Sequence, residues 1–166
     1  MSMTIRLMPE ILTQHPIPPA LHRVNLRLYW GSNRWKKLGR QTREEQDFFC
    51  IACGRKVPHK DGDWLELHEN FTYDCENEIA TINSMVCLCR KCHDYIHIMK
   101  LDAEVREGKA TQEYAYEVSV RGDGILAEHN LEKQTMDVMK WRSPDWKLLY
   151  EGQDLVPLLR EKVTRC

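Results

Sequence analysis

The 166-residue sequence contains no long run of apolar residues, no internal repeat and no low-complexity tract. A membrane-spanning helix needs about 18 or more consecutive apolar residues, and no window of this chain offers them. The start, MSMTIRLMPEILTQHPIP, also lacks the basic region followed by an apolar run that marks a secretory signal peptide. We therefore expect a cytoplasmic protein with no membrane partner.

The chain also has little net charge, −1 at pH 7, which is unlike a protein that coats DNA. This balance hides an asymmetry, because residues 1–60 hold 11 Lys and Arg against 4 Asp and Glu, whereas residues 61–166 hold 13 against 21. The two parts therefore carry +7 and −8. A basic N-terminal part is compatible with a contact face for nucleic acid.

Length and an apolar content of 42% fit one domain with one core. Within it we expect an extended N-terminal arm over residues 1–32, the core over 33–100, and a mostly helical C-terminal extension over 101–166 that packs on the same domain. The arm contains four prolines, each of which biases its predecessor away from helix. The segment 21–30 alternates apolar with polar or basic residues, which also favours extended structure.

Helix-capping residues and the alternation of apolar with polar residues predict the remaining helices and strands. Ser32 or Asn33 can cap a helix that leads to Cys50, and Thr111 can cap one that reaches His129, although two glycines within it favour a break. The other expected elements are strands over 64–74, 79–88 and 146–150 and helices over 91–100 and 132–141.

Seven cysteines are present, an odd number, and four of them form two C-x-x-C pairs. In a reducing compartment this spacing favours metal thiolates over disulfides. Cys50, Cys53, Cys89 and Cys92 are therefore predicted to bind a structural zinc ion, with Cys87 as a possible substitute ligand. Zinc would contribute about 10 kcal/mol to folding. The alternative is four ordinary buried thiols.

A second metal site is predicted from three histidines. His93 and His97 are four residues apart on an expected helix, so their rings share one face. His68, at the end of the first strand of the expected hairpin, can supply the third ligand, and three neutral imidazoles suit Zn, Ni, Mn or a similar divalent ion. Alternatively, His93 is an outer partner or a ligand of the cysteine site, and His97 forms a hydrogen bond in the core.

The helix that precedes Cys50 carries a basic face. Lys36, Lys37, Arg40 and Arg43 are the predicted nucleic-acid contacts, since three of them recur at helical spacing. A solvated helix surface is the other interpretation.

These motifs together resemble a known nuclease superfamily. The order C-x2-C, then LELHE on a strand, then LC-x2-CH-x3-H is similar to the ββα-metal, or HNH, nucleases over about residues 48–100. The resemblance implies an α+β fold with a ββα-metal core, cross-linked here by the four-cysteine zinc site and flanked by helices. It also implies that His68 is a metal ligand, that Glu69 is the general base, and that Asn83 lies near the asparagine that steadies the base.

A narrower resemblance covers most of the chain. A bacterial and phage subgroup of HNH-like proteins has a V-N-L-R segment, a His-Glu-x-Trp-x-Tyr-Asp core and a downstream Trp/Arg-Ser/Trp signature. Here these correspond to residues 24–27, the stretch from His68 with Phe71 in place of Trp, and residues 141–146.

Glu69 departs from the superfamily pattern, in which the base is typically histidine. Glutamate is the weaker base near neutral pH, since its ordinary pKa is about 4.3, although burial can raise it. Alternatively, Glu69 binds the metal and His68 is the base. Adjacent strand residues point to opposite sides, so both can serve one metal only if the strand bends.

The function expected from these features is a metal-dependent endonuclease that hydrolyses phosphodiester bonds in double-stranded DNA with Mg, Mn, Ni or Zn at the catalytic site. A second possibility is a catalytically silent zinc-knuckle module that binds nucleic acid or a protein partner. A third is a zinc-dependent redox or sensor protein that uses the cysteines.

Overall fold

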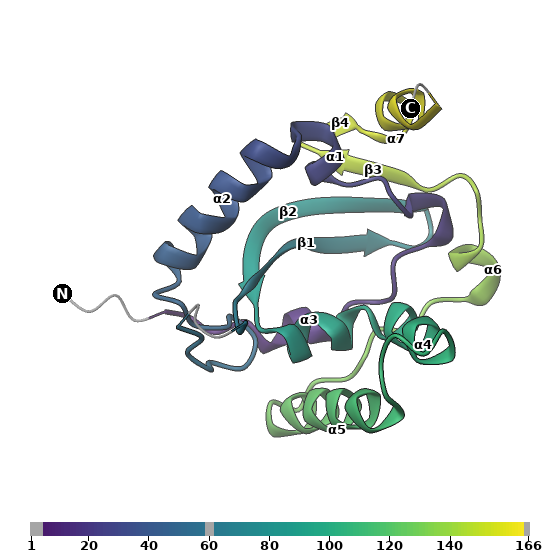
Figure 1. Cartoon of the computed structure of the whole chain (residues 1–166). Helices are drawn as coiled ribbons and strands as arrows, with labels where there is room; N and C mark the ends of the chain where they lie inside the picture. The colour runs from purple at the N-terminus through teal and green to yellow at the C-terminus, as the bar shows by residue number, and fades with distance from the viewer. Residues whose placement is uncertain (1–4, 59–61, 165–166) are drawn as a thin grey trace. The chain divides into compact units, whose positions relative to one another are not determined.

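The computed structural model describes residues 5–58 and 62–164, and these form an α+β structure with a four-stranded sheet (Figure 1). This arrangement confirms the expected α+β fold class, whereas the ββα-metal core stays a prediction. The sheet has the strand order β1-β2-β3-β4. In chain order the elements are η1 Pro9–Thr13, η2 Pro19–Leu21, α1 Leu26–Trp30, α2 Ser32–Glu45, β1 Glu66–Asp74, β2 Ile79–Leu88, α3 Arg90–Ile96, α4 Ile98–Arg106, α5 Gln112–Glu128, α6 Val138–Trp141, β3 Lys147–Tyr150, β4 Gln153–Asp154 and α7 Val156–Thr164.

Contacts within the chain divide it into two compact units, and β1 and β2 each contribute residues to both. The first unit comprises the described residues of 5–16, 42–68 and 86–134, and the second those of 17–41, 69–85 and 135–164. The three ranges expected from the sequence, 1–32, 33–100 and 101–166, stay a prediction.

The first unit packs α5 against α3 and α4 (Figure 1). Thr111 caps α5 by accepting a hydrogen bond from the Tyr114 amide, so the helix predicted from this cap is confirmed. The glycines do not break it. A Cβ atom at Gly122 would overlap the ring of Tyr95, whose hydroxyl donates to Asp123 Oδ1 at 2.6 Å. Gly122 therefore gives Tyr95 the space to pack directly on the helix.

The second unit has its own core on one part of the sheet. Strand β3 pairs in parallel with β2, with Lys147 opposite Ile79, and β4 returns antiparallel to β3. The strand predicted near residues 146–150 is confirmed. Trp146 is fully buried among aliphatic and aromatic side chains, and its Nε1 donates to the Lys140 carbonyl at 2.8 Å. This bond satisfies the one polar atom of an otherwise apolar side chain.

The N-terminal segment is less extended than expected. Residues 26–30, predicted as extended, form α1 instead. Asn25 caps this helix by accepting from the Leu28 amide, and Gly31, at φ 83°, ends it. These end signals outweigh the apolar alternation on which the prediction relied. Likewise η1 and η2 each begin with proline, because proline is well tolerated at the first position of a helix.

Several boundaries also differ from the prediction. The helix expected over 91–100 is interrupted at His97, which ends α3 and precedes α4. The helix expected over 132–141 is reduced to α6, which begins after the Asp137 cap. The helix from Ser32 and the strand over 79–88 are confirmed, while the strand expected from Trp64 begins at Glu66. Over the described part of the chain, no helix has the length and apolarity required to span a membrane.

Candidate metal centres

The first C-x-x-C pair lies in a tight loop after α2. The Gly54 amide donates to the Cys50 carbonyl and the Cys50 amide to the Arg55 carbonyl, each at 2.9 Å. Gly54 has φ +69°, a conformation that glycine adopts without steric cost. The loop therefore reverses within five residues and places Cys50 and Cys53 on the same side.

A buried glutamine connects this loop to the second pair. The Gln46 carboxamide donates to the carbonyls of Phe49 and Cys87 and accepts from the Cys87 amide at 2.8 Å. The Ile51 amide also donates to the Cys87 carbonyl. These bonds hold the end of β2 beside the loop, and Cys89, two residues later, is the N-cap residue of α3.

The four cysteines of the two pairs lie together in the first unit. Their sulfur atoms are all within 4.8 Å of one another, and Cys53 Sγ lies 3.8 Å from Cys89 Sγ. Four sulfurs at the usual zinc–sulfur distance of about 2.3 Å form a tetrahedron with edges of about 3.8 Å. The cluster therefore has the ligand type, number and spacing to hold a zinc ion.

The crowded thiols shift one another's pKa in opposite directions. Hydrogen bonding to the neighbouring thiols, with burial in addition, raises the pKa of Cys92, whereas hydrogen bonds from Cys50 and the other thiols lower the pKa of Cys53. Metal coordination requires thiolates, so a bound cation would drive the remaining deprotonations. Cys87 lies outside the group of four, and burial raises the pKa of its thiol to about 12.

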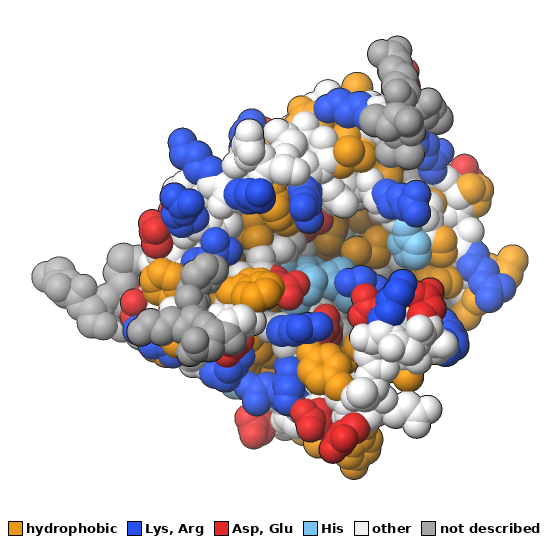
Figure 2. Space-filling model, viewed as in Figure 1, with side chains coloured by type: hydrophobic (Ala, Val, Ile, Leu, Met, Phe, Trp, Pro, Cys, Tyr) orange, Lys and Arg blue, Asp and Glu red, His pale blue; other side chains and the backbone are white. Residues whose placement is uncertain are grey.

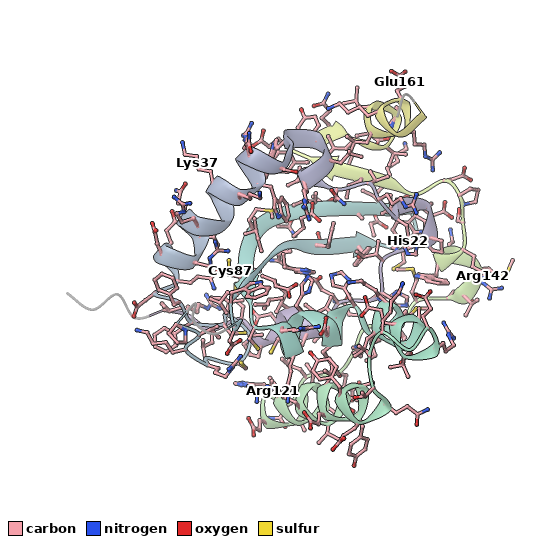
Figure 3. The ribbon with its side chains drawn as sticks, in the orientation of Figure 1. His22, Lys37, Cys87, Arg121, Arg142 and Glu161 are labelled. Carbon is pink, nitrogen blue, oxygen red and sulfur yellow. The ribbon has the colours of Figure 1, made fainter. Side chains whose placement is uncertain are left out.

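Arg121, which Figure 3 labels on α5, contacts this cluster. Its Nη2 donates to Cys53 Sγ at 3.2 Å, and Cys53 is the least buried of the four ligands. Hydrogen bonding to Cys53 raises the pKa of the Arg121 guanidinium. This cation offsets part of the negative charge that four thiolates would place in the first unit.

Three histidines form a second group in the same unit. Ring centroids lie 5.3 Å apart for His68 and His93, 5.2 Å for His68 and His97, and 4.6 Å for His93 and His97. One ring nitrogen from each lies within 4.8 Å of the others. The three rings are therefore close neighbours, even though His97 follows α3 rather than lying within it, and their role as metal ligands stays a prediction.

Outer partners set the orientation of two of these rings. Glu66 Oε2 lies 2.9 Å from His93 Nδ1, so a proton on Nδ1 leaves Nε2 with a free lone pair. His68 Nε2 lies 3.3 Å from Gln14 Oε1, so a proton on Nε2 leaves the Nδ1 lone pair free. A carboxylate or amide behind a histidine is the usual outer support of a metal-binding imidazole.

Burial keeps His68 and His97 neutral. It lowers the pKa of His68 well below its usual range, with help from His93 and His97, and lowers that of His97 to about 3. The hydrogen bond from His93 lowers the pKa of Glu66, which stays an anion. Neutral imidazoles next to a carboxylate are the donor set that a divalent cation needs, so the group can hold such an ion.

No protein-family model, curated protein or solved structure matches this chain. The HNH resemblance therefore depends on the sequence motifs alone. The distances within the cysteine and histidine groups do not depend on that resemblance.

Glu69 does not belong to the histidine group. Its Oε1 accepts a hydrogen bond from the Leu26 amide at 2.6 Å, within the second unit. Burial raises the pKa of Glu69 to about 7. Because alternate strand residues share a face, Glu66 lies on the face of β1 that carries His68, and Glu69 points to the other. The base role of Glu69 stays a prediction.

The remaining predicted site residues lie on β2 and α2. Asn83 is exposed and donates to Thr72 Oγ1 at 3.2 Å, within the second unit. Lys36, Lys37 and Arg40 are exposed on α2, where Figure 2 shows lysine and arginine side chains along the helix. Arg43 is half-buried, and its Nη1 donates to the Leu65 carbonyl at 3.3 Å. Arg43 thus has a structural partner, and all four nucleic-acid contacts stay predictions.

Sequence reasoning missed the residues that support the two metal groups. Glu66 could have been predicted from the sequence, because it precedes His68 by two positions on a predicted strand and therefore shares its face. Gln14 and Arg121 had no such signal, since each comes from a segment distant in sequence.

Proposed function

We propose that the protein is a metal-dependent endonuclease of the HNH type that hydrolyses phosphodiester bonds in DNA. The observation that carries this proposal is the grouping of His68, His93 and His97, next in sequence to a four-cysteine cluster at the start of α3. Cys92 and His93 are consecutive in the sequence, so a zinc ion bound by the cysteines would also fix the position of His93. The catalytic cofactor would be Mg, Mn, Ni or Zn.

The chain's own residues give the site its properties. A divalent cation held there would polarise the phosphate and stabilise the leaving 3′-oxygen. His68 and His97 are neutral near pH 7, so they present lone pairs without competing protons. Glu66 orients His93 and adds one negative charge beside the three rings.

Two carboxylates compete for the role of orienting the attacking water. Glu69 is the base that the family resemblance implies, and its pKa of about 7 suits a base near neutral pH. However, its carboxylate accepts from the Leu26 amide, on the face of β1 opposite His68. Glu66 lies on the same face as His68 and contacts His93 directly. This arrangement favours Glu66.

The second candidate function is a catalytically silent zinc-knuckle module that binds nucleic acid or a protein partner. The engagement of Glu69 by the Leu26 amide, and the fact that Glu69 is not a member of the histidine group, favour this alternative. It predicts binding without cleavage.

Nicking of supercoiled plasmid in the presence of Mn, Mg, Ni or Zn tests the proposal. Wild-type protein should cut with at least one metal, and His93→Ala should reduce the rate by about 100-fold or more because a ligand is lost. Glu66→Gln should reduce it by about 100-fold or more, because the variant loses both the group that orients the attacking water and the outer partner of His93. Glu69→Gln should reduce it by less than about tenfold.

His129→Ala is the matched control, because His129 is an exposed histidine at the end of α5 that belongs to neither group. It should leave the rate unchanged. Absence of cleavage with every metal, or cleavage that His68→Ala and His93→Ala both leave intact, would exclude the nuclease and favour the silent module.

A further inference from the structure

A groove with a volume of about 890 Å³ lies within the second unit, between α2 and β2. Its volume falls within the range of roughly 300–1,000 Å³ typical of ligand sites. Arg34, Lys37 and Gln41 line it from α2, and Asn83 and Ser84 from β2. It is separate in sequence from both metal groups.

Two aromatic rings line the groove. Trp30 and Tyr150 both line it and pack edge-on against each other, with centroids 5.5 Å apart. The Arg34 guanidinium carbon lies 4.7 Å from the Trp30 ring centroid. Stacked guanidinium and aromatic planes are the surfaces on which unpaired nucleic-acid bases stack.

The chain segment that contains Arg34 and Lys37 carries charge of one sign. Residues 11–43 contain seven Lys and Arg and no Asp or Glu, so α1 and the first turns of α2 carry only positive charge. Glu151 is the acidic residue among those that line the groove. A recessed, mostly basic groove with aromatic and carboxamide groups complements a polyanion that also carries flat aromatic bases.

From these features we infer that the groove binds an unpaired strand of nucleic acid, with phosphates at Arg34 and Lys37 and a base at Trp30. A duplex would offer only its phosphates, because its base faces are stacked inside. As a statement about substrate, this rests on the proposed nuclease function. It makes the substrate a nucleic acid with a single-stranded segment, such as a branched or gapped DNA.

Fluorescence anisotropy of labelled (dT)20, without added divalent metal, tests the inference on the full chain. Wild type should bind (dT)20 more tightly than a duplex of equal length. Arg34→Gln combined with Lys37→Gln should weaken binding by about tenfold or more. The slope of log affinity against log salt should fall by about 1.4, because each lost phosphate contact on a single strand contributes about 0.7.

Arg142→Gln combined with Lys147→Gln is the matched control, since both residues are exposed in the same unit, lie outside the groove and remove the same charge. It should change affinity by less than about twofold. A strand of abasic sites with the same phosphates should bind roughly fivefold or more weakly than (dT)20, because base stacking is lost.

The inference is overturned by equal losses in the two double variants, by duplex binding as tight as single-strand binding, or by polyglutamate competing as well as unlabelled (dT)20. The last result would indicate an acidic protein partner instead. Strand binding that persists without plasmid cleavage would refute the nuclease alone. Cleavage that persists while the groove variants bind (dT)20 normally would refute the groove alone.

Discussion

Glu69 holds a carboxyl group in a largely dry environment, with a backbone amide as its hydrogen-bond donor. Burial disfavours the charged form, and the single amide only partly offsets this effect. The residue is therefore a candidate for a structural role at the start of α1, whatever it contributes to chemistry. Its titration gives that role a measurable signature.

The pH dependence of stability should change in Glu69→Gln. The folded state holds a proton on Glu69 up to about pH 7, whereas the unfolded chain releases it near 4.5, so raising the pH between these values destabilises the wild type. Glutamine keeps the acceptor and does not titrate. The stability difference between variant and wild type should therefore grow by about 2.5 kcal/mol from pH 5 to pH 8, as measured by urea unfolding. The same difference at both pH values would show that the carboxyl is not buried as described, and exposed Glu151→Gln serves as the control.

Helix α5 shows how one position can decide the packing of a whole element. Its two glycines are equivalent as helix breakers in the sequence, yet they differ in the structure. Gly122 lies against the Tyr95 ring, whereas a Cβ added at Gly124 would meet no atom within 4 Å from the other described parts of the chain. The continuity of the helix is therefore set by packing on α3 rather than by local propensity.

This difference predicts opposite effects of the same substitution. Gly122→Ala should destabilise the protein by about 1–3 kcal/mol, because the new methyl group overlaps the ring. Gly124→Ala should stabilise it by roughly 0.5–1 kcal/mol, the usual gain from alanine inside a helix. Thermal or urea unfolding of both variants measures this, and two shifts of the same sign would contradict the packing of Tyr95 on Gly122.

Features of the fold that depend on nearby residues could be predicted from the sequence, whereas those that depend on distant residues could not. Local signals located α2, α5, β2 and β3, because caps and apolar alternation act within one element. They missed α1, where Asn25 and Gly31 outweighed a short alternation, and the break at His97. Motif spacing was sufficient to group the cysteines and the histidines. It could not find Arg121 or Gln14, whose contacts depend on how distant segments pack.

On the scale of the whole molecule, the first unit joins segments far apart in the chain through its two metal groups. Cys50 and Cys53 are separated from Cys89 and Cys92 by 35 residues, and one zinc ion would cross-link them. The position of His93 depends on the start of α3, which the cysteine site would hold, because His93 directly follows Cys92. Loss of the cysteine site should therefore disrupt both groups, whereas loss of the histidines should leave the cysteine site intact.

The number of metal ions bound per chain after equilibrium dialysis against zinc tests this account most directly. Wild type should hold two, and His93→Ala combined with His97→Ala should hold one. Cys53→Ser should hold none tightly, and Cys75→Ser, which changes a cysteine outside the group of four, should keep two. One ion in the wild type, or two in the histidine variant, would contradict a metal centre at His68, His93 and His97.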